Sequence, residues 1–365
     1  MKNKIIEELI KLYNSGKLSE VENKVTELIK KDKENFVLYN IFGTVLIDKK
    51  NFKEAIFNYE KSLKINPNYA EGHNNLGIAL YKLGKNIESI NSYKQAIKIK
   101  PDFALAYNNL GLAYKEIHKF AESINSYKAA IKINPNYSEA YNNLGVTFKE
   151  LGELDKSINS YQEAIKINPN YSEAYNNIGN VYNANQEIDN AILNYKKAIE
   201  LNSNFVEAYS NLGILLKEIG QIEEAKKYEE KLLKLKPDDI DIKINLALSI
   251  PPIVNSIDQI TEYRNQYMEG LELLKKYQYF SEIPGSTLKT SFFHLGYHAK
   301  DNLEIMRNTS DLFKKIIPNV NYSSKKIGKK KEQKKIKVGF ISEFFTNHTV
   351  GKLFGGLAKN IDRNK

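Results

Sequence analysis

A row of asparagine side chains is the feature of this sequence best suited to chemistry, and the chemistry is binding. The row recurs every 34 residues, and among the full repeats only Ile41 stands at a corresponding position without being asparagine. A carboxamide offers one acceptor and two donor hydrogens, so it can pair with both the N–H and the C=O of a peptide backbone. The row therefore predicts a surface that holds extended polypeptides of many sequences in one register. Its members are Asn75, Asn109, Asn143, Asn177 and Asn211, each directly before a Leu-Gly or Ile-Gly pair.

Two explanations of this row stay open. Asparagine is abundant and the repeats look like recent copies, since Ile-Asn-Pro-Asn-Tyr-Ser-Glu-Ala-Tyr-Asn-Asn begins at both residue 133 and residue 167. Against this, asparagine weakens a helix by a few tenths of a kcal/mol, and neighbouring non-core positions vary while this one does not. Three residues after the row the copies carry Ile78, Leu112, Val146, Asn180 and Ile214. An asparagine that is kept at one position in spite of its cost to the helix indicates a role in binding.

Two other groupings are weaker candidates for chemistry. His294 and His298 have a metal-ligand spacing, but no third ligand follows them, so histidines in a core or interface are the preferred interpretation. Gly351 and Lys352 stand in the wrong order for a phosphate-binding loop. The chain has no cysteine, which excludes disulfides and cysteine-ligated metal sites. We therefore expect neither a metal nor a bound cofactor in this chain.

Helices with a strict period of 34 residues must carry the row. Tyr107, Leu110 and Gly111 share one face of a first helix, and Tyr127 marks the face of a second. A glycine lets the two helices approach closely, and Pro135 ends the second helix. Each unit is thus an antiparallel helical hairpin. The repeated glycines are Gly43, Gly77, Gly111, Gly145, Gly179 and Gly213, and the repeated tyrosines are Tyr59, Tyr93, Tyr127, Tyr161 and Tyr195.

This order of aromatic, Leu-Gly, aromatic, small residue and proline resembles the tetratricopeptide repeat, whose period is also 34. The last unit has Glu229 in place of the second-helix tyrosine, as a fading terminal repeat would. Residues 1–35 are interpreted as a degenerate amino-terminal repeat or cap. The resemblance implies an all-α superhelical solenoid with a long concave binding groove. The six units are residues 36–69, 70–103, 104–137, 138–171, 172–205 and 206–239.

The region after the repeats changes character. Residues 240–322 are predicted to form a helical connector, with helical patterns over 257–276 and 300–316. Residues 323–335 are predicted to be a lysine-rich linker, although the lysine run at 325–337 also matches a nuclear-localisation or polyanion-binding patch. A short β-branched run and a helix-like segment follow within residues 336–365. They predict the first β-α unit of an α/β domain.

The stretch from Val338 to Gly351 resembles the opening of the catalytic domain in O-GlcNAc transferases and Spindly-type glycosyltransferases. The asparagine row likewise resembles the ladder that grips acceptor polypeptides in those enzymes. Binding of a carboxylate, as in the clamp repeats of chaperones, is disfavoured. Those repeats carry lysine and arginine at these helix positions, whereas here the residue directly before each of four row members is also asparagine. The family's fold implies a two-lobed GT-B domain, cut off here just after its first strand and helix. Asparagine at the preceding sites is Asn74, Asn108, Asn142 and Asn176.

The resemblance assigns a catalytic role to His348, which would help to deprotonate or position the acceptor hydroxyl. A loop histidine that caps the following helix is the alternative. Phe344 stands where many family members carry a polar residue, which puts the hydrogen bonding around this loop in doubt. The nucleotide-sugar donor, UDP-N-acetylglucosamine or GDP-fucose, would bind in a lobe that this chain lacks. We therefore expect the chain to be inactive by itself.

Composition sets the remaining expectations. The 365 residues are 42% hydrophobic and carry a net charge of +10, and almost all of the 54 basic residues are lysine. Because nucleic-acid readers favour arginine, binding to nucleic acid is disfavoured. The charged amino terminus and the absence of a long apolar run argue against export or membrane insertion, so we expect a cytoplasmic protein. The leading hypothesis is the acceptor-binding region of a protein O-glycosyltransferase, and the alternative is a non-catalytic scaffold for protein partners.

Overall fold

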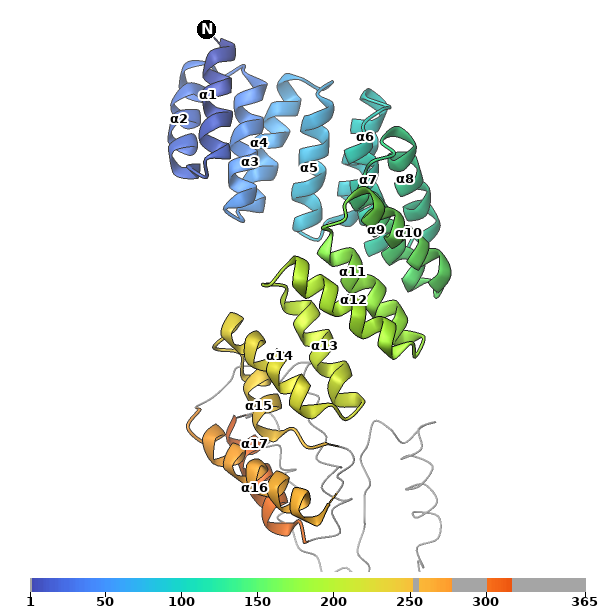
Figure 1. The fold of residues 1–365 in the computed structure, drawn as a ribbon. Coiled ribbons are helices and arrows are strands. Elements are labelled where there is room, and N and C mark those ends of the chain that lie inside the picture. Colours follow the sequence, from blue (N-terminus) through green and yellow to red (C-terminus); the bar gives the residue numbers. More distant parts are fainter. Residues whose placement is uncertain (1, 252–255, 278–300, 317–365) are drawn as a thin grey trace, which may run out of the picture.

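The computed structural model describes residues 2–251, 256–277 and 301–316, and every regular element in these ranges is a helix. Seventeen helices follow one another as a curved stack of antiparallel hairpins (Figure 1). Each helix packs mainly on its neighbours in the chain, so the core runs as a series of small apolar clusters along the stack. The predicted all-α solenoid is therefore confirmed. The predicted β-α unit at 336–365 lies outside the described residues.

The helices keep nearly constant lengths within the repeats. The amino-terminal pair is α1 (Lys2–Asn14) and α2 (Leu18–Lys31). The first helices of the six repeats are α3 (Phe36–Asp48), α5 (Ala70–Lys82), α7 (Ala104–Glu116), α9 (Ser138–Glu150), α11 (Ser172–Ala184) and α13 (Val206–Glu218). The second helices are α4 (Phe52–Ile65), α6 (Asn86–Ile99), α8 (Phe120–Ile133), α10 (Leu154–Ile167), α12 (Ile188–Leu201) and α14 (Ile222–Leu235). The last three are α15 (Ile240–Leu248), α16 (Ile257–Leu274) and α17 (Leu303–Ile316).

Contact between a glycine and a tyrosine joins the two helices in each of the five repeats from 36–69 to 172–205. In repeat 104–137 a Cβ atom added to Gly111 would lie 2.6 Å from Cε1 of Tyr127. Tyr127 is fully buried, so its ring fills the space that the missing side chain leaves. Ser123 on the same helix donates a hydrogen bond from Oγ to the carbonyl oxygen of Gly111 at 2.9 Å. The predicted close approach at the glycine is thus confirmed, with the tyrosine as its partner.

The turn inside each hairpin contains one residue with a left-handed backbone. The φ angles at these six positions lie between 57° and 82°. Glycine adopts this conformation without strain, whereas other residues rarely do. Only every second repeat has glycine at this turn position, so no residue type recurs there with the period of 34 residues. The six residues are Lys50, Gly84, His118, Gly152, Gln186 and Gly220.

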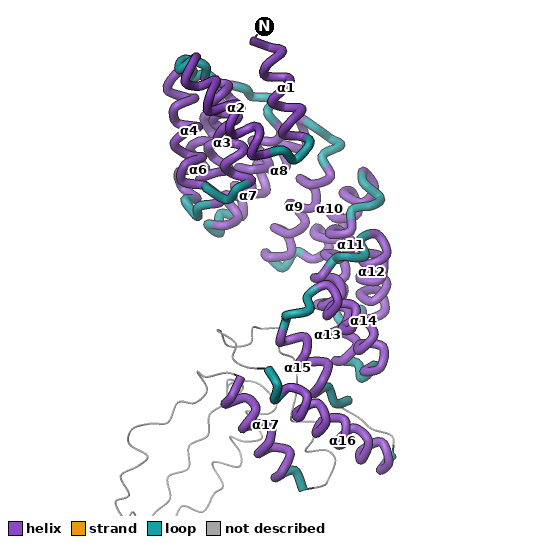
Figure 2. Tube along the Cα trace, turned by 90° about the vertical axis from the view of Figure 1, so that its left-hand side faces the viewer, coloured by secondary structure: helices purple, strands orange, loops and turns teal. Residues whose placement is uncertain are grey.

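The first helices form the inner side of the stack. From α3 to α13, each first helix contacts the first helix of the next repeat, whereas the second helices make no comparable contact with one another. The first helices therefore lie closer together than the second helices, which curves the stack around them. Figure 2 shows this succession of hairpins after a quarter turn. Side chains on the exposed faces of α5, α7, α9, α11 and α13 consequently line the concave surface.

The described chain ends in a different packing unit. Helices α15, α16 and α17 share an apolar cluster around Tyr267 and Leu271, both almost fully buried. At the crossing of α15 and α16, a Cβ atom added to Gly270 would lie 2.2 Å from the carbonyl oxygen of Ala247. The two backbones therefore touch, and only glycine fits there. Helices α16 and α17 occupy segments in which the sequence shows helical patterns.

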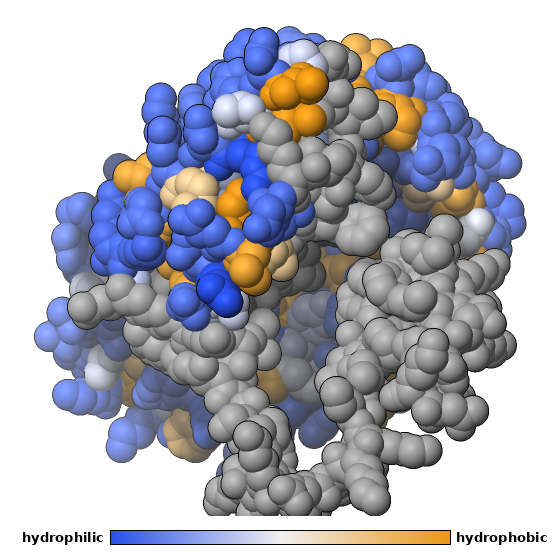
Figure 3. Space-filling model, turned by 90° about the horizontal axis from the view of Figure 1, so that it is seen from below, coloured by the Kyte–Doolittle hydropathy of each residue, from blue (hydrophilic) through white to orange (hydrophobic). Residues whose placement is uncertain are grey.

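The described residues visible in Figure 3 are mainly hydrophilic on this face, with apolar side chains scattered among them. Leu193, at 67% exposure, and Ile257, at 73%, are the most exposed of the large apolar residues. Isolated apolar side chains of this kind are normal for a protein surface. Among the described helices, none combines the length and apolar character needed to cross a bilayer.

Candidate functional site

The predicted asparagine row lies on the concave surface, one residue on each of five consecutive first helices. These helices are α5, α7, α9, α11 and α13, and each asparagine occupies the same place on its helix. All five side chains are half-buried. The structure therefore brings together the five residues that the sequence singled out, in the order of the repeats.

The row forms a ladder of hydrogen bonds between repeats. In every step, Nδ2 of a row asparagine donates to Oδ1 of a second asparagine, which lies one repeat earlier in the chain. The steps are Asn75 to Asn40 at 3.1 Å, Asn109 to Asn74 at 2.9 Å, Asn143 to Asn108 at 3.0 Å, Asn177 to Asn142 at 3.0 Å and Asn211 to Asn176 at 3.0 Å. The amides thus connect the first helices of adjacent repeats across the concave surface.

The accepting asparagines form a second, deeper row. They are at most 8% exposed, and Asn108 is fully buried. A buried amide oxygen needs a donor, because an unsatisfied one costs about 1–3 kcal/mol. The deeper row therefore gives a structural reason for the fixed asparagine that the sequence analysis missed. The deeper row could have been found in the sequence, because an asparagine directly precedes most members of the first row and recurs with the same period of 34 residues. The members of the deeper row are Asn40, Asn74, Asn108, Asn142 and Asn176.

The three middle amides of the row keep unused hydrogen-bonding capacity. In Asn109, Asn143 and Asn177 the ladder engages one amide hydrogen, and no other described group accepts the second. No described donor reaches Oδ1 of these three residues either. One donor and one acceptor per amide are therefore left, which matches the N–H and C=O of a peptide backbone. The ladder fixes the orientation of each amide before any ligand arrives.

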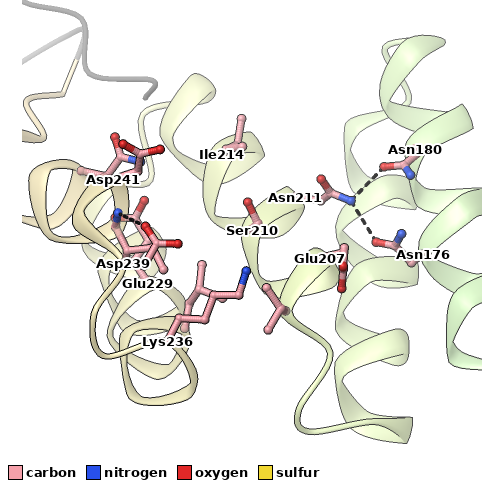
Figure 4. Close-up of a pocket in the computed structure, with 14 residues that line it drawn as sticks. Asn176, Asn180, Glu207, Ser210, Asn211, Ile214, Glu229, Lys236, Asp239 and Asp241 are labelled. Carbon is pink, nitrogen blue, oxygen red and sulfur yellow. Dashed lines mark hydrogen bonds between the residues drawn. The ribbon is translucent and has the colours of Figure 1, made fainter. Parts of the chain in front are cut away.

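A pocket of about 400 Å³ continues the row at its carboxyl-terminal end. Residues of α11, α13, α14 and α15 line it, among them Asn176 and Asn211 of the two rows. Figure 4 shows Asn211 bonded to both Asn176 and Asn180. Asn180 Oδ1 accepts from Asn211 Nδ2 at 3.1 Å and from the hydroxyl of Tyr195 at 2.9 Å. The last step of the ladder is thus tied, through Asn180, to the packing tyrosine of repeat 172–205.

Glu229, which takes the place of the packing tyrosine in repeat 206–239, lines the same pocket. Its Oε1 forms an ion pair with Nζ of Lys217 at 2.5 Å, and their side chains are only 6% and 10% exposed. Burial raises the pKa of Glu229 above the ordinary carboxyl value, while the charge of Lys217 opposes that change. The residue that the sequence suggested as a sign of a fading repeat is therefore half of a buried ion pair.

Other residues considered in the sequence lie outside the described part. These are the catalytic candidate His348, the histidines His294 and His298, and the lysine run at 325–337. Within the described residues, no group of three or more histidine, aspartate or glutamate side chains is placed to hold a metal ion. The site that the structure does describe is a polar surface of half-buried amides.

The chain matches the models of two repeat families. The model described as TPR repeat matches residues 43–84, 79–117, 119–152, 147–186 and 179–220. The model described as tetratricopeptide repeat matches residues 206–239. Together they cover more than half of the chain. The search of curated proteins found no match.

Solved structures of repeat proteins are similar to this chain. A tetratricopeptide repeat protein from Parabacteroides merdae aligns with a TM-score of 0.55 at 18% identity, over 67% of this chain and 96% of its own. A chain of the APC/C hetero-tetramer Cut9-Hcn1 also gives a TM-score of 0.55, at 17% identity, over 66% of this chain and 48% of the other. MamA is 34% identical over 44% of this chain and 94% of its own, with a TM-score of 0.41. The first two support the fold alone.

Proposed function

The chain belongs to the tetratricopeptide repeat proteins, which suits it to protein–protein interaction, and we propose that its asparagine row binds an extended polypeptide by the backbone. The observation that carries the proposal is the pair of unused amide groups on each of Asn109, Asn143 and Asn177. They lie side by side on the concave surface and are held in one orientation by the ladder. Preorganised donors and acceptors of this kind lose little entropy when a ligand binds.

The spacing of the row supports an extended ligand. Helices in contact pack about 8–10 Å apart, so adjacent row amides are separated by about that distance. An extended chain advances about 3.3 Å per residue, so about three residues span one repeat. Five amides would then follow about 12–15 residues of one polypeptide. Because the amides meet backbone groups, the ligand's side chains would contribute little along most of this length.

A peptide with a blocked backbone tests this proposal. The probe is a fluorescein-labelled peptide of about 15 residues, rich in serine and threonine. Shuffling its sequence is expected to change the affinity by less than about threefold. Methylating three backbone nitrogens removes three donors, at about 1 kcal/mol each, and should weaken binding by about a hundredfold. Fluorescence anisotropy gives both affinities.

The shuffled peptide is the control for composition, and a peptide methylated outside the bound segment is the control for bulk. A strong effect of shuffling together with tolerance of N-methylation would contradict backbone recognition. That result would place the specificity in side-chain pockets.

A finer proposal is that the bound polypeptide is the acceptor of a protein O-glycosyltransferase, with its serine or threonine passed to a nucleotide-sugar site. It rests on the resemblance of residues 338–351, including His348, to the start of that family's catalytic domain. The competing proposal is a scaffold that assembles partners through the same groove. Radiolabelled UDP-N-acetylglucosamine and GDP-fucose, incubated with cell protein and a version of the protein extended beyond residue 365, separate the two. Transfer of label supports the transferase, and its absence from both donors supports the scaffold.

A further inference from the structure

The pocket at the end of the asparagine row is acidic, although the chain as a whole carries a net charge of +10. Among the described residues that line it, Lys236 is the only basic one. In Figure 4 the carboxylates of Glu229, Asp239 and Asp241 lie on the side opposite the asparagines of α11 and α13. The charge of the pocket therefore complements a cationic ligand. The lining carboxylates are Glu207, Glu229, Asp239 and Asp241.

One carboxylate oxygen of Glu229, a residue that lines the pocket, lacks a hydrogen-bond donor. The residue is 5% exposed, and its Oε1 is already engaged by Lys217. Its Oε2 is buried and has no hydrogen-bond partner among the described residues. Buried carboxylate oxygens are normally paired, because desolvation without a partner is unfavourable. A ligand that brings one positively charged donor would satisfy this oxygen.

The geometry of the acids favours an organic cation over a metal ion. No three of the acids among the described residues are close enough together to hold a metal. A guanidinium group binds best to both oxygens of one carboxylate, but Glu229 has only one oxygen left. An ammonium group has three donors that point in different directions, so it suits separate single acceptors.

We propose that this pocket takes the side-chain ammonium of a lysine in the polypeptide that lies along the row. Val206, Ile214 and Ile242 supply apolar lining for the methylene stem, while the acids meet the charged end. Because Asn211 belongs to both the row and the pocket, the lysine lies at one end of the bound segment. The inference rests on the proposed function and adds one position of side-chain specificity to it.

Peptides that differ only at one terminal position test the inference. The set carries a single lysine at the amino end, a single lysine at the carboxyl end, or N-acetyl-lysine at the same places. Acetylation keeps the stem but removes the charge. One of the two lysine peptides should bind the full chain at least about tenfold more tightly than its acetylated form, because a charge-assisted hydrogen bond is lost.

A substitution in the pocket identifies the site of this preference. Glu229→Tyr restores the tyrosine of the other repeats, and the glycine that faces this tyrosine in those repeats is present here as Gly213, so the variant is expected to fold. It should abolish the preference for lysine, so that the lysine and acetyl-lysine peptides bind with equal affinity. Glu223→Gln is the matched control, since Glu223 lies on the same helix with its side chain 69% exposed. That variant should keep the preference.

The outcomes are distinguishable. Equal affinities for the lysine and acetyl-lysine peptides would overturn the inference, yet leave backbone binding by the row in place. A preference for lysine that survives Glu229→Tyr would also overturn it, because a general attraction to acidic surface would then be responsible. If none of the peptides binds, both the inference and the proposed function fail.

Discussion

Replacing Gly111 by alanine is expected to destabilise the protein by about 2 kcal/mol or more, although alanine is the better helix former. The new Cβ atom would lie 2.6 Å from Cε1 and 2.8 Å from Cζ of Tyr127. The tyrosine ring is fully buried, so it cannot swing into solvent. The helices would have to separate, and the packing of repeat 104–137 would be lost. Urea unfolding followed by circular dichroism measures the change.

Gly213 provides the matched control within the same chain. It occupies the same repeat position, but Glu229 replaces the tyrosine, and the nearest atom to an added Cβ is Cγ of Glu229 at 3.4 Å. Gly213→Ala is therefore expected to be neutral or to stabilise by up to about 1 kcal/mol through helix propensity. The change in the free energy of unfolding should therefore have opposite signs in the two variants, or be close to zero in Gly213→Ala. Similar losses in both would show that the tyrosine contact is not what requires glycine.

The sequence was sufficient to predict the hairpins, because their determinants recur at fixed spacing. Gly111 and Tyr127 mark the contact between the two helices, and both recur with the period of 34. The left-handed turn was not predicted, because His118 and Gln186 take the conformation that Gly84 and Gly152 take in other repeats. A position defined by backbone geometry leaves no periodic signal when several residue types tolerate it.

The candidate site was predicted only in part. The asparagine row was found, since its members share one residue type, but the bond from Asn109 to Asn74 joins neighbouring repeats and depends on how the repeats stack. Glu229 was seen as a departure from the pattern. Its pairing with Lys217 could not be read from the period, because the two residues lie on different helices of one hairpin. Partners across helices require the packing geometry as well as the sequence.

Removing the row amides is expected to weaken binding of an extended peptide by about a hundredfold. The variant Asn109→Ala, Asn143→Ala, Asn177→Ala removes three amides, each with an unused donor and acceptor on the concave surface. At about 1 kcal/mol per lost interaction, the loss in binding is about 3 kcal/mol. The same change also breaks three ladder bonds, so stability falls by about the same amount.

The deeper row separates these two effects and provides the most direct test of the binding proposal. Asn74→Ala, Asn108→Ala, Asn142→Ala breaks the same three ladder bonds but leaves the row amides in place. It also removes the bond from Asn108 to Glu139 at 3.3 Å, so it should be at least as destabilising. The decisive measurement is the affinity of both triple variants for the labelled peptide, at a temperature where circular dichroism shows both folded. We predict a loss of about a hundredfold in the row variant and of less than about fivefold in the deeper-row variant. Equal affinities in the two variants would contradict the proposal and leave the asparagine ladder a purely structural device.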